Sequence, residues 1–157
     1  MARWPLTARR RDGAGFEDRM PTRILVIDDD KMTLQFVGTL LRSAGYEVQV
    51  AADGPAGLAL ATSAPPDIVL LDVVMPAMDG YEVCRRLRND PKTQNVLVIM
   101  LTASGDPTLN HQAYAAGAYA CVPKPFRREA LIATIESVRA GAVRQKPDSP
   151  SKGGGKV

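Results

Sequence analysis

The strongest constraint on the fold is an alternation, repeated five times, between short apolar runs and longer amphipathic segments. The apolar runs, which predict strands, cover residues 23–27, 47–51, 67–72, 96–101 and 119–123. The amphipathic segments, which predict helices, cover residues 31–44, 54–63, 80–89, 107–116 and 127–139. Near-continuous apolar runs are typical of strands that are covered on both faces. The pattern therefore predicts an α/β domain with a parallel sheet and helices on both faces.

Few strand orders are compatible with five such repeats, because the connections between parallel strands are right-handed. The commonest solution is the doubly wound, flavodoxin-like order 2-1-3-4-5, whose ligand site lies beyond the carboxyl ends of strands 1 and 3. Pro123, within the fifth apolar run, supports this order. Proline lacks an N–H group and is tolerated at a sheet edge, and the fifth strand is an edge strand in this order.

One domain, placed at residues 21–140, accounts for most of the 157 residues, of which 45% are hydrophobic and 24% charged. The segments 1–20 and 141–157 are basic and lack apolar periodicity, so we expect disordered tails. The tails hold the excess of Lys and Arg, whereas the domain between them is mildly acidic. Basic tails are compatible with nucleic acid or acidic lipid as partners, but solvated ends are the simpler interpretation.

Several classes of protein are excluded at this stage. No apolar run approaches the roughly 20 residues needed to cross a bilayer, so no membrane span is expected. The first residues contain no apolar segment of the kind found in secretory signals. The two cysteines, Cys84 and Cys121, are far apart and form no CxxC pattern, which argues against a disulfide framework or a zinc site. Their scarcity suits the reducing cytoplasm.

Acidic residues close two of the predicted strands. Asp28, Asp29 and Asp30 follow the first strand, and Asp72 ends the third. These strands are neighbours in the predicted order, so at least three carboxylates should converge and repel one another unless a cation neutralises them. Oxygen ligands without histidine or cysteine select Mg2+ or Mn2+. Capping of the next helix is the alternative role for Asp29 or Asp30, but it does not explain Asp72.

Two more polar residues should point at the same edge of the sheet. Thr102 closes the fourth strand and Lys124 follows the fifth. Taken alone, Thr102 is more often a strand-end residue and Lys124 a solvated loop lysine. Together, a hydroxyl and an ammonium facing clustered carboxylates would form an anion site beside a cation site, which is what a phosphorylated aspartate needs.

These pieces resemble the receiver domains of bacterial two-component response regulators, the CheY-like family. The resemblance covers about residues 22–138. It rests on four motifs in the family's order and spacing: ILVIDDD at 24–30, DIVLLDVVMPAMDGYEVCRRLR at 67–88, VIMLTA at 98–103 and Lys-Pro-Phe at 124–126. Each motif alone is weak to moderate, and the four together form a strong signal.

The resemblance implies a set of metal ligands and a phosphoryl acceptor. Asp72 would be the phosphoacceptor. Asp29 would bind Mg2+ directly, and Asp28 would act largely through water or a hydrogen bond. Asp72 itself and the backbone carbonyl of Val74 would complete the protein ligands, and Mn2+ would substitute for Mg2+.

The resemblance also assigns the remaining site residues. Thr102 would hydrogen-bond one phosphoryl oxygen and Lys124 would pair with another. Pro76 and Gly80 match the loop that shapes the site. The peptide bond between Lys124 and Pro125 would be cis.

The implied function is that of a signalling switch in the cytoplasm. A sensor histidine kinase or a phosphotransfer protein would donate the phosphoryl group, and the chain would catalyse only its own phosphorylation and dephosphorylation. Residues 107–139 would supply the surface read by a downstream protein. We expect a stand-alone receiver without a DNA-binding domain, and leave open whether phosphorylation drives weak dimerisation.

Two positions depart from the family's pattern. Most receivers have Tyr or Phe three residues before the lysine, an aromatic ring that turns inward on activation, whereas this chain has Cys121. Tyr119 lies about 7 Å away along the strand, so the usual coupling from site to surface is in doubt. A small buried filler is a simpler role for Cys121 than a redox sensor. Val74 replaces a residue that is often polar and positions the attacking water, which suggests slow hydrolysis of the phosphoryl group.

Other functions fit the sequence less well. A phosphatase of the haloacid-dehalogenase type carries DxDxT on strand 1, and the Asp28-Asp29-Asp30-Lys31-Met32 segment lacks that threonine. A flavin carrier of similar topology needs a Ser/Thr/Gly-rich phosphate loop, and the acidic loop here would repel the phosphate of FMN. Nucleic-acid binding through the tails would be sensitive to salt and lost on trimming them.

Overall fold

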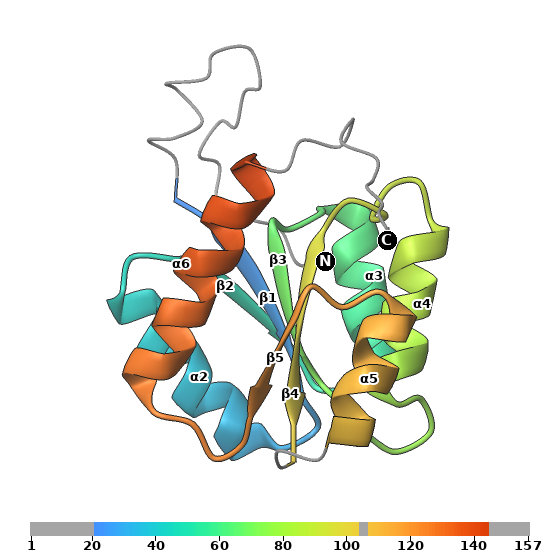
Figure 1. Cartoon of the computed structure of the whole chain (residues 1–157), viewed down its shortest axis with the longest axis horizontal. Coiled ribbons are helices and arrows are strands. Elements are labelled where there is room, and N and C mark those ends of the chain that lie inside the picture. Colours follow the sequence, from blue (N-terminus) through green and yellow to red (C-terminus); the bar gives the residue numbers. More distant parts are fainter. Residues whose placement is uncertain (1–20, 104–106, 145–157) are drawn as a thin grey trace, which may run out of the picture. The chain divides into compact units, whose positions relative to one another are not determined.

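The computed structural model describes residues 21–103 and 107–144, and the predicted tail 1–20 and residues 145–157 lie outside them. Five strands are present in this part of the chain: β1 (Arg23–Ile27), β2 (Glu47–Ala51), β3 (Ile68–Asp72), β4 (Leu97–Thr102) and β5 (Ala120–Pro123). The helices between and after them are α2 (Lys31–Ser43), α3 (Gly54–Ser63), α4 (Gly80–Asn89), α5 (Pro107–Ala116) and α6 (Arg128–Arg144). Strand and helix therefore alternate as predicted (Figure 1).

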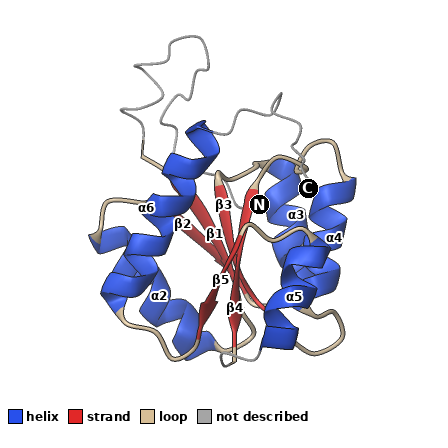
Figure 2. Cartoon of the chain, viewed as in Figure 1, coloured by secondary structure: helices blue, strands red, loops and turns tan. Residues whose placement is uncertain are grey.

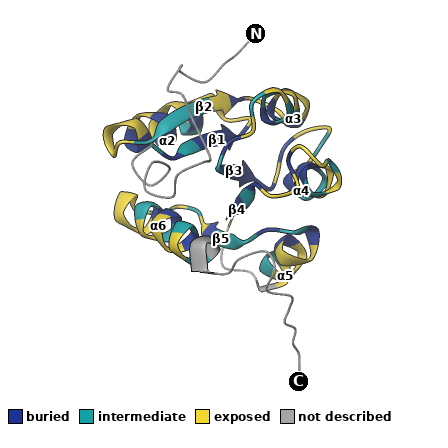
Figure 3. Ribbon diagram, turned by 90° about the horizontal axis from the view of Figure 1, so that it is seen from above, coloured by how far each residue is buried: buried dark blue, intermediate teal, exposed yellow. Residues whose placement is uncertain are grey.

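The strands form one parallel sheet in the order β2-β1-β3-β4-β5, which confirms the predicted topology (Figure 2). The chain divides after Pro125 into two units. The first unit contains the whole sheet with α2, α3, α4 and α5, and the second contains α6. Within the first unit, α2 lies on one side of the sheet and α3, α4 and α5 lie on the other (Figure 3).

The central strands are buried on both faces, as their apolar sequence predicts. The four apolar residues of β1 are at most 1% exposed. Leu25 and Ile27 belong to one apolar cluster with Val83 and Leu87 of α4, on the side of the sheet where α4 lies. Since neighbouring residues of a strand face opposite sides, the two intervening residues of β1 face the side that α2 covers.

An aspartate stands at the N-terminus of each of the helices α2, α3 and α4. Asp30, Asp53 and Asp79 are the N-caps of α2, α3 and α4, and each side chain accepts a hydrogen bond from a backbone N–H of the first turn. Gly45 ends α2 with a φ of 99°, a left-handed conformation that glycine adopts without strain. The capping residues thus fix where the helices begin and end.

The helices show two further features, an exposed apolar pair in α2 and an end of α6 that differs from the sequence prediction. Met32 and Phe36 share the apolar spacing of α2, yet they are 79% and 57% exposed, because the stripe that faces the sheet is centred on Leu34, Val37 and Leu41. Helix α6 runs to Arg144, beyond the expected end at residue 139 and into the segment expected to be disordered. The alanines at 140 and 142 favour helix, and a single glycine between them costs too little to end it.

No helix in the described part of the chain combines the length and the apolar character that a membrane span requires.

Candidate functional site

The aspartates at the ends of β1 and β3 come together at one edge of the sheet. Asp28 directly follows β1, Asp72 is the last residue of β3, and these strands are hydrogen-bonded neighbours with Ile27 opposite Leu71. Each of Asp28, Asp29 and Asp72 offers a carboxylate oxygen that lies within 4.8 Å of those of the other two. The sheet topology is the cause, because the carboxyl ends of adjacent parallel strands meet at one edge.

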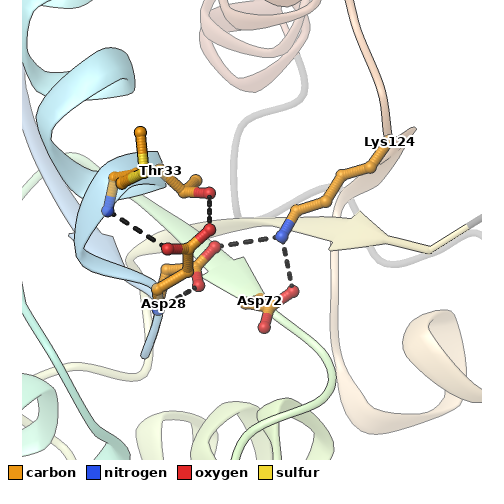
Figure 4. Close-up of polar contacts among 6 residues, drawn as sticks. Asp28, Thr33, Asp72 and Lys124 are labelled. Carbon is orange, nitrogen blue, oxygen red and sulfur yellow. Dashed lines mark hydrogen bonds and ion pairs between the residues drawn. The ribbon is translucent and has the colours of Figure 1, made fainter.

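Lys124 reaches into this acidic group from the end of β5. Its Nζ donates to Asp28 Oδ2 at 3.0 Å and to Asp72 Oδ1 at 3.0 Å (Figure 4). The backbone N–H of Lys124 also donates to the carbonyl of Thr102 at 2.6 Å, which ties the residue to the end of β4. The ammonium group thereby bridges the carboxylates that follow β1 and end β3.

Burial and neighbouring charges shift the ionisation of this group. Burial, with the charges of Asp28 and Asp29, raises the pKa of Asp72 although the Lys124 hydrogen bond opposes the rise. Burial by itself would lower the pKa of Lys124, but the hydrogen bonds and charges of Asp72 and Asp28 outweigh it and raise that pKa. Three ionised carboxylates against one ammonium leave an excess of two negative charges, which a divalent cation would neutralise.

Asp28, Asp29 and Asp30 differ in their surroundings. Asp28 is 1% exposed, and its Oδ1 accepts a hydrogen bond from the backbone N–H of Asp30 at 2.9 Å. Asp30 is the helix cap: it accepts from the N–H of Met32 at 3.1 Å and from the hydroxyl of Thr33 at 2.8 Å. The hydroxyl of Thr33 and the N–H of Met32 lower the pKa of Asp30. Asp29 is exposed and belongs to the acidic group, so the capping role falls to Asp30.

The group fits a hard divalent ion. Its donors are carboxylate oxygens alone, and two of the three aspartates are buried, so the ligands are held in place by the fold. Hard ions such as Mg2+ prefer oxygen ligands, whereas the nitrogen and sulfur donors typical of zinc are missing from this group.

The loop from β3 to α4 passes close to Asp72. The N–H of Gly80 donates to the carbonyl of Val73 at 2.8 Å, and a Cβ atom on Gly80 would lie 2.3 Å from the carbonyl oxygen of Asp72. Only glycine fits this approach. Ala77, in the same loop, has a φ of 71°, an uncommon conformation for a residue with a side chain. The side chain of Val74 is 70% exposed, two residues beyond Asp72.

Thr102 and the Lys124–Pro125 peptide complete the set of predicted site residues. Thr102 is fully buried at the end of β4, and its partner in the sheet is Pro123. The peptide bond between Lys124 and Pro125 is cis, as predicted. All the side chains proposed from the sequence therefore come from strand ends at one edge of the sheet.

The surroundings of Cys121 were not predicted. Cys121 is half-buried in β5. Burial raises the pKa of the Cys121 thiol, although the Tyr114 hydroxyl opposes this. The sequence prediction considered only Tyr119, on the strand itself. The spacing of seven residues between Tyr114 and Cys121 crosses a helix–strand junction, so no local pattern reveals the effect of Tyr114 on the pKa of this thiol.

The chain belongs to the family of response regulator receiver domains. The family's model matches residues 24–136, which is most of the described chain. A receiver domain is a signal-transducing module of two-component systems that is phosphorylated by a partner protein, and the motifs, strand order and acidic edge described above are those of this family.

Several curated proteins are similar to this chain. The DNA-binding dual master transcriptional regulator RpaA of Synechocystis is 42% identical over 116 residues, which are 74% of this chain and 48% of that protein. The response regulator PleD of Caulobacter vibrioides is 40% identical over 76% of this chain and 26% of its own length. The response regulator MprA of a Mycobacterium is 41% identical over 84% of this chain and 57% of its own length. The chain thus matches only part of each of these proteins.

Some solved structures are matched by this chain over almost their whole length. The chemotaxis response regulator CheY4 of Vibrio cholerae has a TM-score of 0.73 and 35% identity, covering 76% of this chain and 99% of that one. The receiver domain of the sensor histidine kinase PA1611 of Pseudomonas aeruginosa has a TM-score of 0.71 and 28% identity. The match covers 77% of this chain and 99% of that one. That structure has a magnesium ion coordinated in its active-site cleft.

Proposed function

We propose that this receiver accepts a phosphoryl group on Asp72 from the phosphohistidine of a sensor histidine kinase or a phosphotransfer protein. The observation that supports this most strongly is the cluster of Asp28, Asp29 and Asp72 with the ammonium of Lys124 bonded across it. The cluster combines a nucleophile, a place for a divalent cation and a fixed positive charge for the transferred group.

Asp28, Asp29 and Asp72 would hold Mg2+, or Mn2+ in its place, with the backbone carbonyl of Val74 as a further oxygen ligand. When bound, the ion supplies positive charge to the oxygens of the phosphoryl group. The carboxylate-only donor set supports this assignment, and the magnesium in the PA1611 receiver domain is consistent with it.

The chain's own residues account for the remaining chemistry. A carboxylate oxygen of Asp72 attacks the phosphorus, the P–N bond of the phosphohistidine breaks, and its electron pair stays with the imidazole. Lys124 already donates to Asp72, so a small movement lets the same ammonium donate to a phosphoryl oxygen, where it offsets the charge of a loose transition state. The hydroxyl of Thr102 would donate to a second phosphoryl oxygen.

The chain acts on no substrate other than its own aspartate in this proposal. Water later attacks the acyl phosphate and restores Asp72, so phosphorylation and dephosphorylation form a cycle of two states. The phosphoryl group adds charge and acceptor oxygens, and these shift an existing equilibrium between conformations. The signal then passes through protein–protein contacts made by α5 and β5, to a partner recognised by those surfaces.

Phosphorylation by a small phosphodonor tests the proposal. The chain is incubated with acetyl phosphate, with Mg2+ or with EDTA, and its intact mass is measured. We expect a gain of one phosphoryl group that requires Mg2+ and is lost in Asp72→Ala. The folded state of Asp72→Ala is checked by circular dichroism. Equal labelling of the two proteins, or labelling in EDTA, would contradict the proposal. A candidate kinase then replaces the small donor.

A further inference from the structure

The loop of residues 73–79 connects β3 to α4 and begins at the acidic edge of the sheet. The N–H of Gly80 donates to the carbonyl of Val73 at 2.8 Å, which closes the loop at its base. Val73 and Met75 are 4% and 6% exposed, so the backbone of Val74 lies between two buried side chains. Packing therefore sets the path of the first half of this loop.

The second half of the loop contains a strained turn. The N–H of Met78 donates to the carbonyl of Pro76 at 2.7 Å, and Ala77 between them has a φ of 71°. A hydrogen bond between residues two apart, around a positive φ, defines the form of γ-turn that is rare and strained. Such a conformation persists only where the surrounding structure holds it. Pro76 and Ala77 are exposed, whereas Met78 is partly buried, so Met78 is the residue of this turn that packing can hold.

Met78 packs against α3. A Cβ atom on Gly54, the first residue of α3, would lie 2.9 Å from Sδ of Met78 and 3.2 Å from its Cβ, so the Met78 side chain lies directly on the backbone of that helix. Met78 also packs against the apolar cluster that contains Val83 and Leu87. The turn is thereby attached to α3, an element that contributes none of the proposed site residues.

A change in this turn would reach the proposed metal site through few bonds. Val74, whose carbonyl is a proposed oxygen ligand, lies three residues before Ala77 and two after Asp72. If Met78 left its place on α3, Ala77 would relax to a negative φ, since a positive φ is unfavourable for a residue with a Cβ atom. The backbone next to Val74 would then take a different path.

We propose that Met78 is a positioning residue. Seated on α3, it holds the γ-turn at Ala77 and thereby keeps the backbone of Val74 in place for a bound divalent ion. Met78 itself touches neither the ion nor the phosphoryl group. The holding of the turn is independent of any ligand, whereas its effect on the ion rests on the proposed function.

Backbone scalar couplings of Ala77, measured by NMR on the full chain in EDTA, test whether Met78 holds the turn, because these couplings report φ. We expect a positive φ in wild type and in Met78→Leu, which keeps an apolar side chain of similar size, and averaged couplings in Met78→Ala. Leu60→Ala is the matched control: it shortens another partly buried side chain that packs against the same cluster, and it should leave the couplings unchanged. Wild-type couplings in Met78→Ala would overturn the proposal.

Mn2+ binding tests the link to Val74, because the relaxation of water protons counts the waters bound to this ion. We expect about one more bound water in Met78→Ala, in place of the Val74 carbonyl, and about 10-fold weaker Mg2+ binding, the lower range for residues that support a metal site. Leu60→Ala and Met78→Leu should match wild type in both. An unchanged number of bound waters in Met78→Ala would overturn the link. Failure of wild type to bind either ion contradicts the proposed metal site instead, and the couplings in EDTA still decide the role of Met78.

Two variants at the exposed Ala77 test the same link if Met78→Ala fails to fold. Ala77→Val disfavours the positive φ without removing any buried side chain, and we expect it to weaken Mg2+ binding as Met78→Ala does. Ala77→Gly adopts the positive φ without strain and should bind Mg2+ at least as tightly as wild type. Equal Mg2+ affinities of these two variants would show that the site does not depend on this turn, and would overturn the proposal.

Discussion

Asp28, Asp29 and Asp30 follow one another after β1, and identical side chains take different roles because their surroundings differ. Asp28 is buried and bonded to Lys124, Asp30 caps α2, and Asp29 is exposed beside the other acids. The sequence predicted the cluster and left open which aspartate caps the helix. The backbone decides this, because Asp30 stands at the N-cap in an extended conformation and its carboxylate accepts from the N–H of Met32 in the first turn of α2.

Exchange of these two neighbours for alanine should separate metal binding from folding. Asp30→Ala should lower the midpoint of thermal unfolding, because two donors of the first turn lose their acceptor, while Mg2+ affinity changes little. Asp29→Ala should leave the metal-free midpoint unchanged and weaken Mg2+ binding by at least tenfold. Calorimetric unfolding with and without Mg2+ measures both quantities. Equal effects of the two variants on Mg2+ binding would contradict the assignment.

Asp72 should lower the stability of the metal-free protein at neutral pH. Its pKa is raised in the folded state above the ordinary value of 3.8, chiefly by burial, so the fold favours the protonated form. The stabilisation that a protonated Asp72 contributes is present below pH 3.8 and is lost as the pH rises through the folded pKa.

The isosteric variant Asp72→Asn, which stays neutral, should therefore unfold at a higher temperature than wild type at pH 7, by a few degrees for a gain of about 1 kcal/mol. The difference should shrink as the pH falls towards 4. Thermal unfolding in EDTA across this range measures it. A variant less stable than wild type at pH 7 would show that ionised Asp72 is stabilised by Lys124 more than it is penalised.

Val74 should prolong the phosphorylated state. Its exposed isopropyl group lies two residues past Asp72 and offers the attacking water no hydrogen bond. Val74→Asn supplies a polar group of similar size, and we expect the acyl phosphate to hydrolyse several-fold faster, as followed by intact mass after removal of the phosphodonor. Val74→Ala is the control for the change of size and should hydrolyse at nearly the wild-type rate. An unchanged rate in Val74→Asn would refute this role.

At the scale of helices and strands, the elements themselves could be predicted from local sequence, whereas the contacts between elements could not. The strands, the helix caps and the aspartates at strand ends follow from patterns within a few residues. Contacts between distant elements do not follow from such patterns: Arg88 of α4 donates to the carbonyls of Gly117, Val96 and Gln94. Its partners are backbone atoms that only the packed fold brings near.

Two helical glycines should respond in opposite ways to alanine. A Cβ on Gly57 of α3 would lie 2.3 Å from Cδ1 of the fully buried Ile27, so Gly57→Ala should destabilise the fold by about 1–3 kcal/mol, the usual cost of overpacking. A Cβ on Gly38 of α2 would come no closer than 3.2 Å, to the flexible end of Arg42. Gly38→Ala should stabilise by up to about 1 kcal/mol through helix propensity. Urea unfolding measures both, and loss of stability in both variants would contradict the argument for Gly38.

At the scale of the whole molecule, the strand order was predicted in full, because right-handed crossovers and apolar strands leave few alternatives. The acidic edge follows from that order, since neighbouring parallel strands deliver their carboxyl ends to one place. The end of α6 was predicted five residues too early, because helix ends depend on weak local preferences. The excess negative charge at the sheet edge, opposed by a single lysine, remains the feature from which the proposed switch derives.

The most direct test of that switch is to locate the phosphoryl group chemically. The chain is phosphorylated with acetyl phosphate and Mg2+, reduced with borohydride, digested and sequenced by mass spectrometry; reduction converts an aspartyl phosphate to homoserine. The account predicts homoserine at position 72, dependent on Mg2+ and absent when Asp29 is replaced by alanine. Homoserine at another aspartate, or a phosphoryl group that resists reduction and stays on a serine, threonine or histidine, would contradict it.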